Sequence, residues 1–179
     1  MSTPIYLDYN ATTPVAPEAA EAMRVFLHEA YGNPSSTHAH GRIARQAVAE
    51  ARSQVAALIG AAPEEIVFTG CATEANNLAL LGAAQALVDR GSAKRHLVIS
   101  AVEHPAVMAP AMCLRAQGWE VTVVPVDAWA QVSTEAVRRA LRDDTALVSV
   151  MHANNEVGTL QPIADIARLT RPRGILLHT

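Results

Sequence analysis

Short polar segments that directly follow apolar runs hold the side chains best able to do chemistry. Three such segments occur in the chain, at residues 69–73, 103–104 and 152–156. In an open parallel sheet, ligands gather at the carboxyl ends of the strands, so residues that follow different strands can meet at one site. Imidazole titrates near neutral pH, and hydroxyl and amide groups bind polar ligand atoms. Together the three segments predict one ligand-binding site.

The first of these segments belongs to a stretch with the pattern of a strand, a turn and a helix. The β-favouring run 66–68 leads into Gly70, and Thr73 opens a helical pattern rich in Ala and Leu. Unpaired N–H groups and the helix dipole favour an anion at such a helix start, and Thr73 is expected to cap the helix and to offer its hydroxyl to a phosphate. The stretch contains neither G-x-G-x-x-G nor G-x-x-x-x-G-K-[ST], so it supports neither a Rossmann nor a P-loop site. An ordinary strand-to-helix turn explains this stretch alone equally well.

Composition and charge place the chain among α/β proteins with one sizeable core. It has 179 residues, half of them apolar and only 4% aromatic, with a net charge of −3. No basic stripe is present, so neither nucleic acid nor a membrane is an expected partner. The N-terminus lacks the pattern of a signal peptide, and the longest apolar region, residues 78–88, is too short to span a bilayer. A soluble, cytoplasmic protein is expected.

The elements that must position the polar segments alternate along the chain. Residues 17–31 and 42–59 are expected to be helices, separated by a polar loop at 32–41. Short apolar runs separated by helical patterns then predict a mostly parallel sheet with helices on both faces. The expected strands are 65–69, 97–100, 120–125, 146–151 and 174–178, and the expected helices between them are 73–89, 105–117, 134–141 and 162–170.

Five segments, in this order and spacing, resemble the cysteine desulfurases. These are pyridoxal-phosphate enzymes of the class V aminotransferase group and of fold type I. The resemblance covers the chain from Pro4 to Thr179. The segments are Tyr-Leu-Asp-Tyr-Asn-Ala-Thr-Thr-Pro at 6–14, Gly-Asn-Pro-Ser-Ser at 32–36, Phe-Thr-Gly-Cys-Ala-Thr-Glu at 68–74, Glu-His at 103–104 and Met-His-Ala-Asn-Asn-Glu-Val-Gly at 151–158.

The resemblance implies a role for each site residue and a domain division. Ala72 and Thr73 would hold the phosphate of pyridoxal 5'-phosphate, through a backbone N–H and a hydroxyl. His104 would stack on the pyridine ring and act as a catalytic acid or base, and Asn155 would hydrogen-bond the phenolic oxygen of the ring. The fold implied is part of the three-layer α/β/α large domain, formed by residues 16–179, with residues 1–15 belonging to the small domain.

Three groups of the family pattern are absent from this sequence. In the family an Asp that pairs with the pyridinium nitrogen, a Schiff-base Lys and a nucleophilic Cys all follow the strand that ends here at Thr179. The only lysine is Lys94, which has no family role, and the cysteines Cys71 and Cys113 match no catalytic position. The chain is therefore expected to be the N-terminal half of a desulfurase, inactive alone.

The implied reaction converts L-cysteine to L-alanine and leaves a persulfide sulfur on the enzyme, for a sulfur acceptor or an iron–sulfur scaffold protein. A homodimer is implied. The alternatives are a selenocysteine lyase or another class V enzyme, and a truncated fragment without catalysis.

Simpler interpretations of individual residues stay open. His104 can be a helix-cap residue, Cys71 a small residue tolerated in a turn, and Cys113 a core residue. The pair His38 and His40 lacks acidic or thiol partners, and no metal site is expected.

Overall fold

The computed structural model describes residues 4–179 and divides into two compact units, the first ending at Phe68 and the second running from Thr69 to Thr179. The domain boundary expected after residue 15 stays a prediction. No helix in the described part of the chain is long and apolar enough to cross a membrane.

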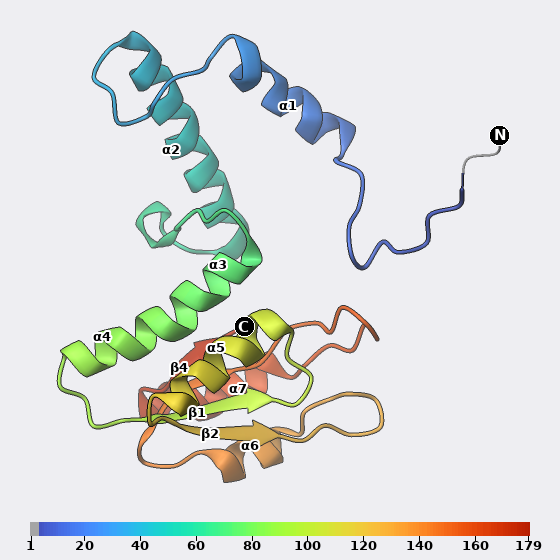
Figure 1. The fold of residues 1–179 in the computed structure, drawn as a ribbon, viewed down its shortest axis with the longest axis vertical. Helices are drawn as coiled ribbons and strands as arrows, with labels where there is room; N and C mark the ends of the chain where they lie inside the picture. Colours follow the sequence, from blue (N-terminus) through green and yellow to red (C-terminus); the bar gives the residue numbers. More distant parts are fainter. Residues whose placement is uncertain (1–3) are drawn as a thin grey trace. The chain divides into compact units, whose positions relative to one another are not determined.

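The first unit holds two helices, α1 (Pro17–His28) and α2 (Ala39–Ile59), as Figure 1 shows. Pro17 occupies the first helical position of α1, where its missing N–H costs no hydrogen bond. Helix α2 ends at Gly60, whose left-handed φ of 68° suits a residue without Cβ. Both helices were predicted, but α1 ends three residues earlier than expected and α2 begins three residues earlier.

The polar loop between these helices packs tightly against the start of α2. A Cβ added to Gly41 would lie 2.3 Å from the backbone oxygen of Ser36, so only glycine fits there. The Arg45 guanidinium donates to the backbone oxygens of Pro34 and Ser36, at 2.8 and 3.0 Å. The loop is thus held to α2 by the close approach of Gly41 and by the Arg45 side chain.

The second unit contains a sheet of four strands that are all parallel, which confirms the predicted fold class. The spatial order β2-β1-β3-β4 places β1 and β3 at the centre. Both central strands are buried along their whole length. Their bounds are β1 (His96–Ser100), β2 (Glu120–Val124), β3 (Thr145–Ser149) and β4 (Leu176–His178).

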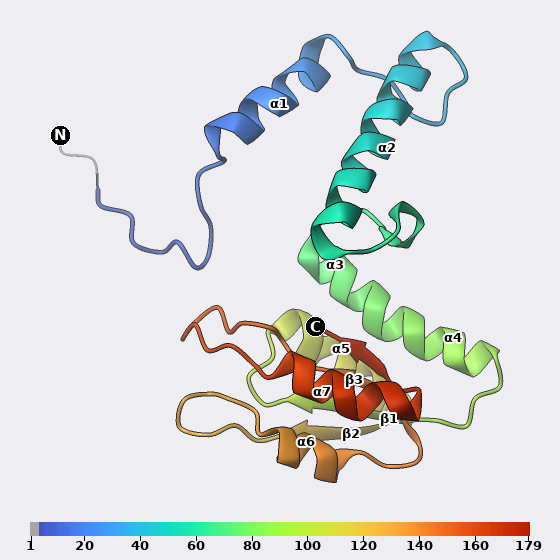
Figure 2. The ribbon, with the colours of Figure 1, turned by 180° about the vertical axis from the view of Figure 1, so that it is seen from behind.

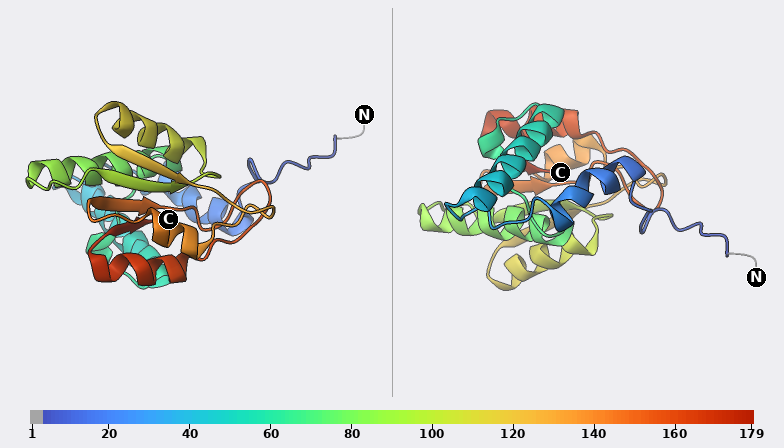
Figure 3. Two further views of the ribbon diagram at one scale, coloured as in Figure 1. Left: turned by 90° about the horizontal axis from the view of Figure 1, so that it is seen from below. Right: turned by 90° about the horizontal axis from the view of Figure 1, so that it is seen from above.

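Helices cover both faces of this sheet, as two opposite views show (Figures 1 and 2). Helix α5 (Pro105–Ala116) packs on one face, together with the continuous helical segment formed by α3 (Ala72–Asn77), the π-helical turn η2 (Leu78–Gly82) and α4 (Ala83–Asp89). Helices α6 (Thr134–Ala140) and α7 (Ile163–Thr170) pack on the other face. The left view of Figure 3 shows the strands between the two helical layers.

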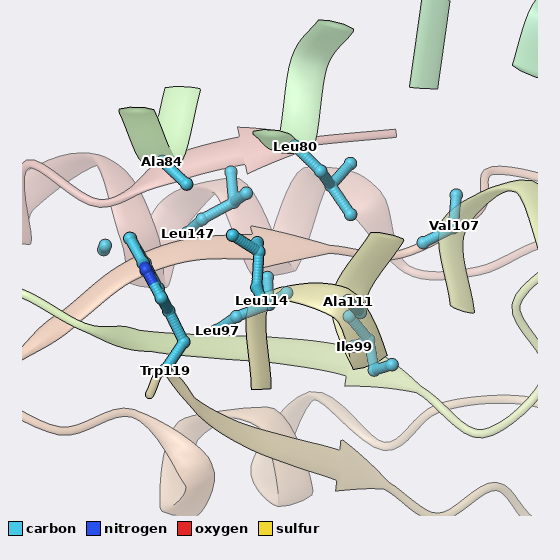
Figure 4. Close-up of a cluster of buried hydrophobic side chains, with 10 residues drawn as sticks. Leu80, Ala84, Leu97, Ile99, Val107, Ala111, Leu114, Trp119 and Leu147 are labelled. Atoms are coloured by element: carbon cyan, nitrogen blue, oxygen red, sulfur yellow. The ribbon is translucent and has the colours of Figure 1, made fainter. Parts of the chain in front are cut away.

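Two apolar clusters fill the space between the sheet and its helices. On the α5 face, Leu80 from η2 meets Leu97, Ile99 and Leu147 from the two central strands (Figure 4). On the α6 and α7 face, the cluster is built around Val98, Val148 and Ile166. Alternate residues of each strand therefore supply opposite cores, as expected for a sheet buried on both faces.

The structure corrects the stretch around residue 70. No strand forms at residues 65–69, where a 3-10 turn, η1 (Pro63–Glu65), is followed by extended chain without a strand partner. The predicted cap at Thr73 is also wrong, because the helix already begins at Ala72 and Thr73 is its second residue. Cys71 occupies the cap position and makes no side-chain cap bond.

A polar cluster lies at the opposite end of β1 from the predicted site. The ring of His96 is fully buried, with Nδ1 at 2.8 Å from Thr145 Oγ1 and Nε2 at 2.8 Å from Thr122 Oγ1. These contacts join β1 to both of its neighbouring strands. Burial and the positive charge of Arg142 lower the pKa of His96, although the carboxylates of Asp144 and Glu120 oppose that shift.

Leu80→Ala should lower the free energy of unfolding by about 2–5 kcal/mol, because the substitution opens a cavity in the buried cluster. Leu78→Ala is the matched control, since Leu78 lies in the same π-helical turn but is 53% exposed. Its loss should be within about 0.5 kcal/mol in urea denaturation. Equal losses in both variants would contradict the packing described.

His96 should also make stability depend on pH. Its pKa is lowered in the folded state, so the unfolded chain binds more protons as pH falls below the ordinary value of 6.5. The stabilisation is therefore present above pH 6.5 and is lost as pH falls, with a slope of at most about 1.4 kcal/mol per pH unit. His96→Gln should flatten the decline measured by denaturation between about pH 5 and pH 7; an unchanged slope in this variant would show that other groups cause it.

Candidate functional site

The start of α3 presents a set of free hydrogen-bond donors. Within the described residues, the backbone N–H groups of Ala72, Thr73 and Glu74 have no acceptor. The Glu74 carboxylate folds back to accept from the Gly70 N–H at 2.6 Å, and the Thr69 hydroxyl donates to the Cys71 backbone oxygen at 3.2 Å. These bonds order the turn before the helix while its first N–H groups stay available to an anion.

His104 is the N-cap residue of α5. Its Nδ1 accepts a hydrogen bond from the Ala106 N–H at 3.0 Å, and Pro105 follows at the first helical position. The cap interpretation of His104 is therefore confirmed. Because Nδ1 is an acceptor, the neutral ring carries its proton on Nε2, the atom that remains available to a ligand.

Thr73 and His104 line the same cavity, although they are 31 positions apart in the sequence. The cavity has a volume of about 450 Å³ and lies between the α3–η2 segment and α5. Cys113 also lines it and is exposed, so the prediction that Cys113 belongs to the core is wrong. Its other lining residues are Asn77, Leu81, Pro105, Ala106, Ala109 and Pro110.

Asn155 lies on an exposed loop after β3 and is not among the residues that line this cavity. Its Nδ2 donates to Glu156 Oε1 at 3.0 Å. The loop itself is shaped by the buried Asn154, whose Oδ1 accepts from the N–H groups of Glu156 and Val157 at 2.9 and 3.0 Å. The Asn154 side chain thus makes the bonds that form this turn.

One buried carboxyl group joins the loops that follow β1 and β3. Glu103 is 9% exposed, and its Oε1 accepts from the Ser100 hydroxyl at 2.5 Å and from the Met151 N–H at 2.8 Å. Burial raises the pKa of Glu103, although both hydrogen bonds oppose the shift. Glu103 lies within one of the five segments that resemble the family, but no role was predicted for it. The only signal was an acidic residue directly after an apolar run.

His178 lies at the same end of the sheet, on the edge strand β4. Its Nδ1 lies 2.8 Å from the hydroxyl of Ser149 on β3, and burial lowers its pKa. This pair holds the ends of β3 and β4 together.

The other candidate residues, His38, His40 and Cys71, do not line the cavity of Thr73 and His104. His38 caps α2 by accepting from the Gly41 N–H, and the His40 ring stacks on Tyr31 with centroids 5.6 Å apart. Cys71 is exposed at the start of α3. Across residues 4–179, no group of three His, Cys, Asp or Glu side chains is arranged to hold a metal ion.

Comparison with known proteins identifies the family. The model of the family "Aminotransferase class-V" matches residues 5–179. The chain belongs to the aminotransferase class V family. Its relatives in this family include the cysteine desulfurase IscS of Dictyoglomus turgidum, which is 46% identical over 179 residues, an alignment that covers 100% of this chain and 45% of that protein.

Solved structures of this family have the same fold. A NifS-like protein matches with a TM-score of 0.92 at 40% identity, over 98% of this chain and 48% of the other. The structure named "SspA in complex with cysteine" matches with a TM-score of 0.91 at 38% identity, over 97% of this chain and 49% of the other. The chain thus spans about half the length of the class V relatives that it matches.

The cap function of His104 can be separated from any ligand contact by substitution. His104→Ala removes the acceptor of the Ala106 N–H and should lower the free energy of unfolding by about 1 kcal/mol. The free energy of unfolding of His104→Asn should stay close to that of the unsubstituted protein, because Asn is a good N-cap residue without an aromatic ring. Urea denaturation measures both changes, and equal losses in the two variants would argue against the cap.

Proposed function

We propose that this chain forms the pyridoxal 5'-phosphate site of a cysteine desulfurase. The observation that supports this most directly is the cavity lined by Thr73 and His104, next to a helix start with free N–H groups. In this proposal the phosphate binds the N–H groups of Ala72 and Thr73 and the Thr73 hydroxyl.

The residues present fit the chemistry of this cofactor. A dianionic phosphate needs several donors, and the start of α3 offers backbone N–H groups together with a hydroxyl. A flat aromatic ring needs a planar partner, and the His104 imidazole is exposed and held by its Nδ1 bond. Apolar side chains of the same cavity, such as Leu81 and Pro110, can exclude water from one side of such a ring.

Each residue has a distinct task in the proposed site. When bound, the cofactor supplies an electron sink for bonds at the substrate α-carbon. His104 stacks on the ring and can exchange a proton at Nε2, because Nδ1 is occupied by the Ala106 N–H. Asn155 would donate to the phenolic oxygen of the ring through Nδ2, which donates to Glu156 Oε1 in this structure.

The proposed reaction converts L-cysteine to L-alanine and passes the sulfur, as an enzyme persulfide, to an acceptor or iron–sulfur scaffold protein. The cysteine desulfurases among the relatives support the substrate class. We further propose a cytoplasmic homodimer in which residues 1–15 belong to the small domain and residues 16–179 to the large domain.

Titration with pyridoxal phosphate, followed by absorbance and fluorescence, tests the binding site. A Lys94→Arg background removes the only lysine, so that nonspecific imine formation there does not obscure the result. Thr73→Val should weaken binding about tenfold or more, because one charge-assisted hydrogen bond to phosphate is lost. Thr134→Val is the matched control, since Thr134 also lies in the first turn of a helix but lines no part of this cavity. Pyridoxal, which lacks the phosphate, should bind weakly to all variants; equal binding of both compounds would refute a phosphate site.

Activity is measured on the protein produced from its complete coding sequence. Alanine and sulfide formed from L-cysteine with a reductant would support the desulfurase. Selenide release from selenocysteine without turnover of cysteine would support the selenocysteine lyase instead. Cofactor binding without either activity would support a chain that is not catalytic.

A further inference from the structure

The two loops that hold the proposed ring-binding residues are joined through Glu103. The loop after β1 contains Glu103 next to His104, and the loop after β3 runs from Met151 to Asn155. The Glu103 carboxyl group accepts a hydrogen bond from the Ser100 hydroxyl, at the end of β1, at 2.5 Å. It accepts a second one from the backbone N–H of Met151, in the loop after β3, at 2.8 Å. The contact spans 48 positions of sequence, with Glu103 buried and Met151 half-buried.

We infer that Glu103 is a positioning residue, which sets the His104 loop against the Asn155 loop so that both side chains can meet one cofactor ring. This inference rests on the proposed function. Glu103 does not line the cavity of Thr73 and His104, so its effect on a ligand must pass through its neighbours.

A second hydrogen bond joins the same two loops. The Asn154 Nδ2 lies 3.4 Å from the backbone oxygen of Val102, next to Glu103, while its Oδ1 organises the turn that contains Asn155. Asn155 is thus attached to the His104 loop through its immediate neighbour as well as through Met151. Two polar contacts between the same two loops restrict their relative movement more than one contact would.

The contact between the two loops requires a carboxyl or carboxamide oxygen as the hydrogen-bond acceptor at position 103. Both donors meet the single atom Oε1, so glutamine can replace glutamate and keep the two bonds. Alanine removes the acceptor and leaves a buried hydroxyl and a buried N–H without a partner, which is unfavourable. A conservative variant therefore exists that changes the charge but not the contacts.

The test compares Glu103→Ala and Glu103→Gln in the full protein, with Thr122→Val as the matched control. Thr122 also contributes a hydrogen bond to the central strand, but at the opposite end of the sheet. Glu103→Ala should weaken pyridoxal phosphate binding about tenfold, as expected for the loss of an outer contact that orients binding groups. The affinity of Glu103→Gln for pyridoxal phosphate should stay within about threefold of the unsubstituted protein. Thr122→Val should lower thermal stability without weakening pyridoxal phosphate binding.

A double-mutant cycle separates positioning from general destabilisation. If Glu103 acts through His104, the Glu103→Ala change should cost little cofactor affinity in a His104→Asn background. Amide exchange at Met151, measured without cofactor, should accelerate in Glu103→Ala and stay slow in Glu103→Gln. If Glu103→Ala does not fold, Glu103→Met, which keeps the volume without the acceptor, replaces it in every measurement.

Each other outcome overturns the inference. Unchanged affinity in Glu103→Ala, or an equal loss in Thr122→Val, would show that Glu103 supports only the fold. Full additivity with His104→Asn would show that Glu103 does not act through His104, which overturns the joint positioning of the two loops. If the unsubstituted protein binds no pyridoxal phosphate, the proposed function fails and the positioning role fails with it. Accelerated exchange at Met151 in that case would leave the Glu103 bond as a purely structural contact.

Discussion

Burial of β1 on both faces limits where polar chemistry can occur in the second unit. All five residues of this strand have no exposed surface, so a polar group within it needs a protein partner. The polar groups are accordingly confined to the two ends, where His96 meets threonines of the neighbouring strands and Ser100 meets Glu103. The first end is closed by strand-to-strand contacts. The second end opens into loops, and the proposed site lies there, at the end of a parallel sheet where ligands usually bind.

The proposed site depends on this sheet through apolar packing as well as through loops. Thr73 does not follow a strand; it lies on a helix that reaches the sheet through Leu80 of the π-helical turn. His104 reaches the same cavity from the other side, on the cap of α5, a helix packed in the same apolar cluster. The apolar cluster holds the segment that begins at Ala72 and helix α5 on the same face of the sheet, and so helps to position the proposed phosphate donors relative to the His104 imidazole. π-Helical turns often occur near functional sites, and here the turn directs Leu80 into that core.

The sequence predicted the parallel sheet and most of its helices, because apolar runs were bounded by Gly, Pro and polar caps. The strand predicted at residues 65–69 does not form. The side chains there favour β structure, but a strand also needs a pairing partner, which the local sequence pattern does not reveal. The sequence also misplaced the cap of α3, since a Cys at the cap position gives no side-chain signal. The roles of Ala72, Thr73, His104 and Asn155 came from family resemblance. The connection through Glu103 was not predictable, because the carboxyl group accepts a hydrogen bond from Met151, which lies 48 positions away in the sequence.

A crystal structure determined after addition of pyridoxal phosphate would show directly whether this cavity binds the cofactor. We expect phosphate density at the N–H groups of Ala72 and Thr73, with the pyridine ring against the His104 imidazole. Density for the cofactor elsewhere on the protein, or a saturating titration that leaves the cavity of Thr73 and His104 empty, would contradict this expectation.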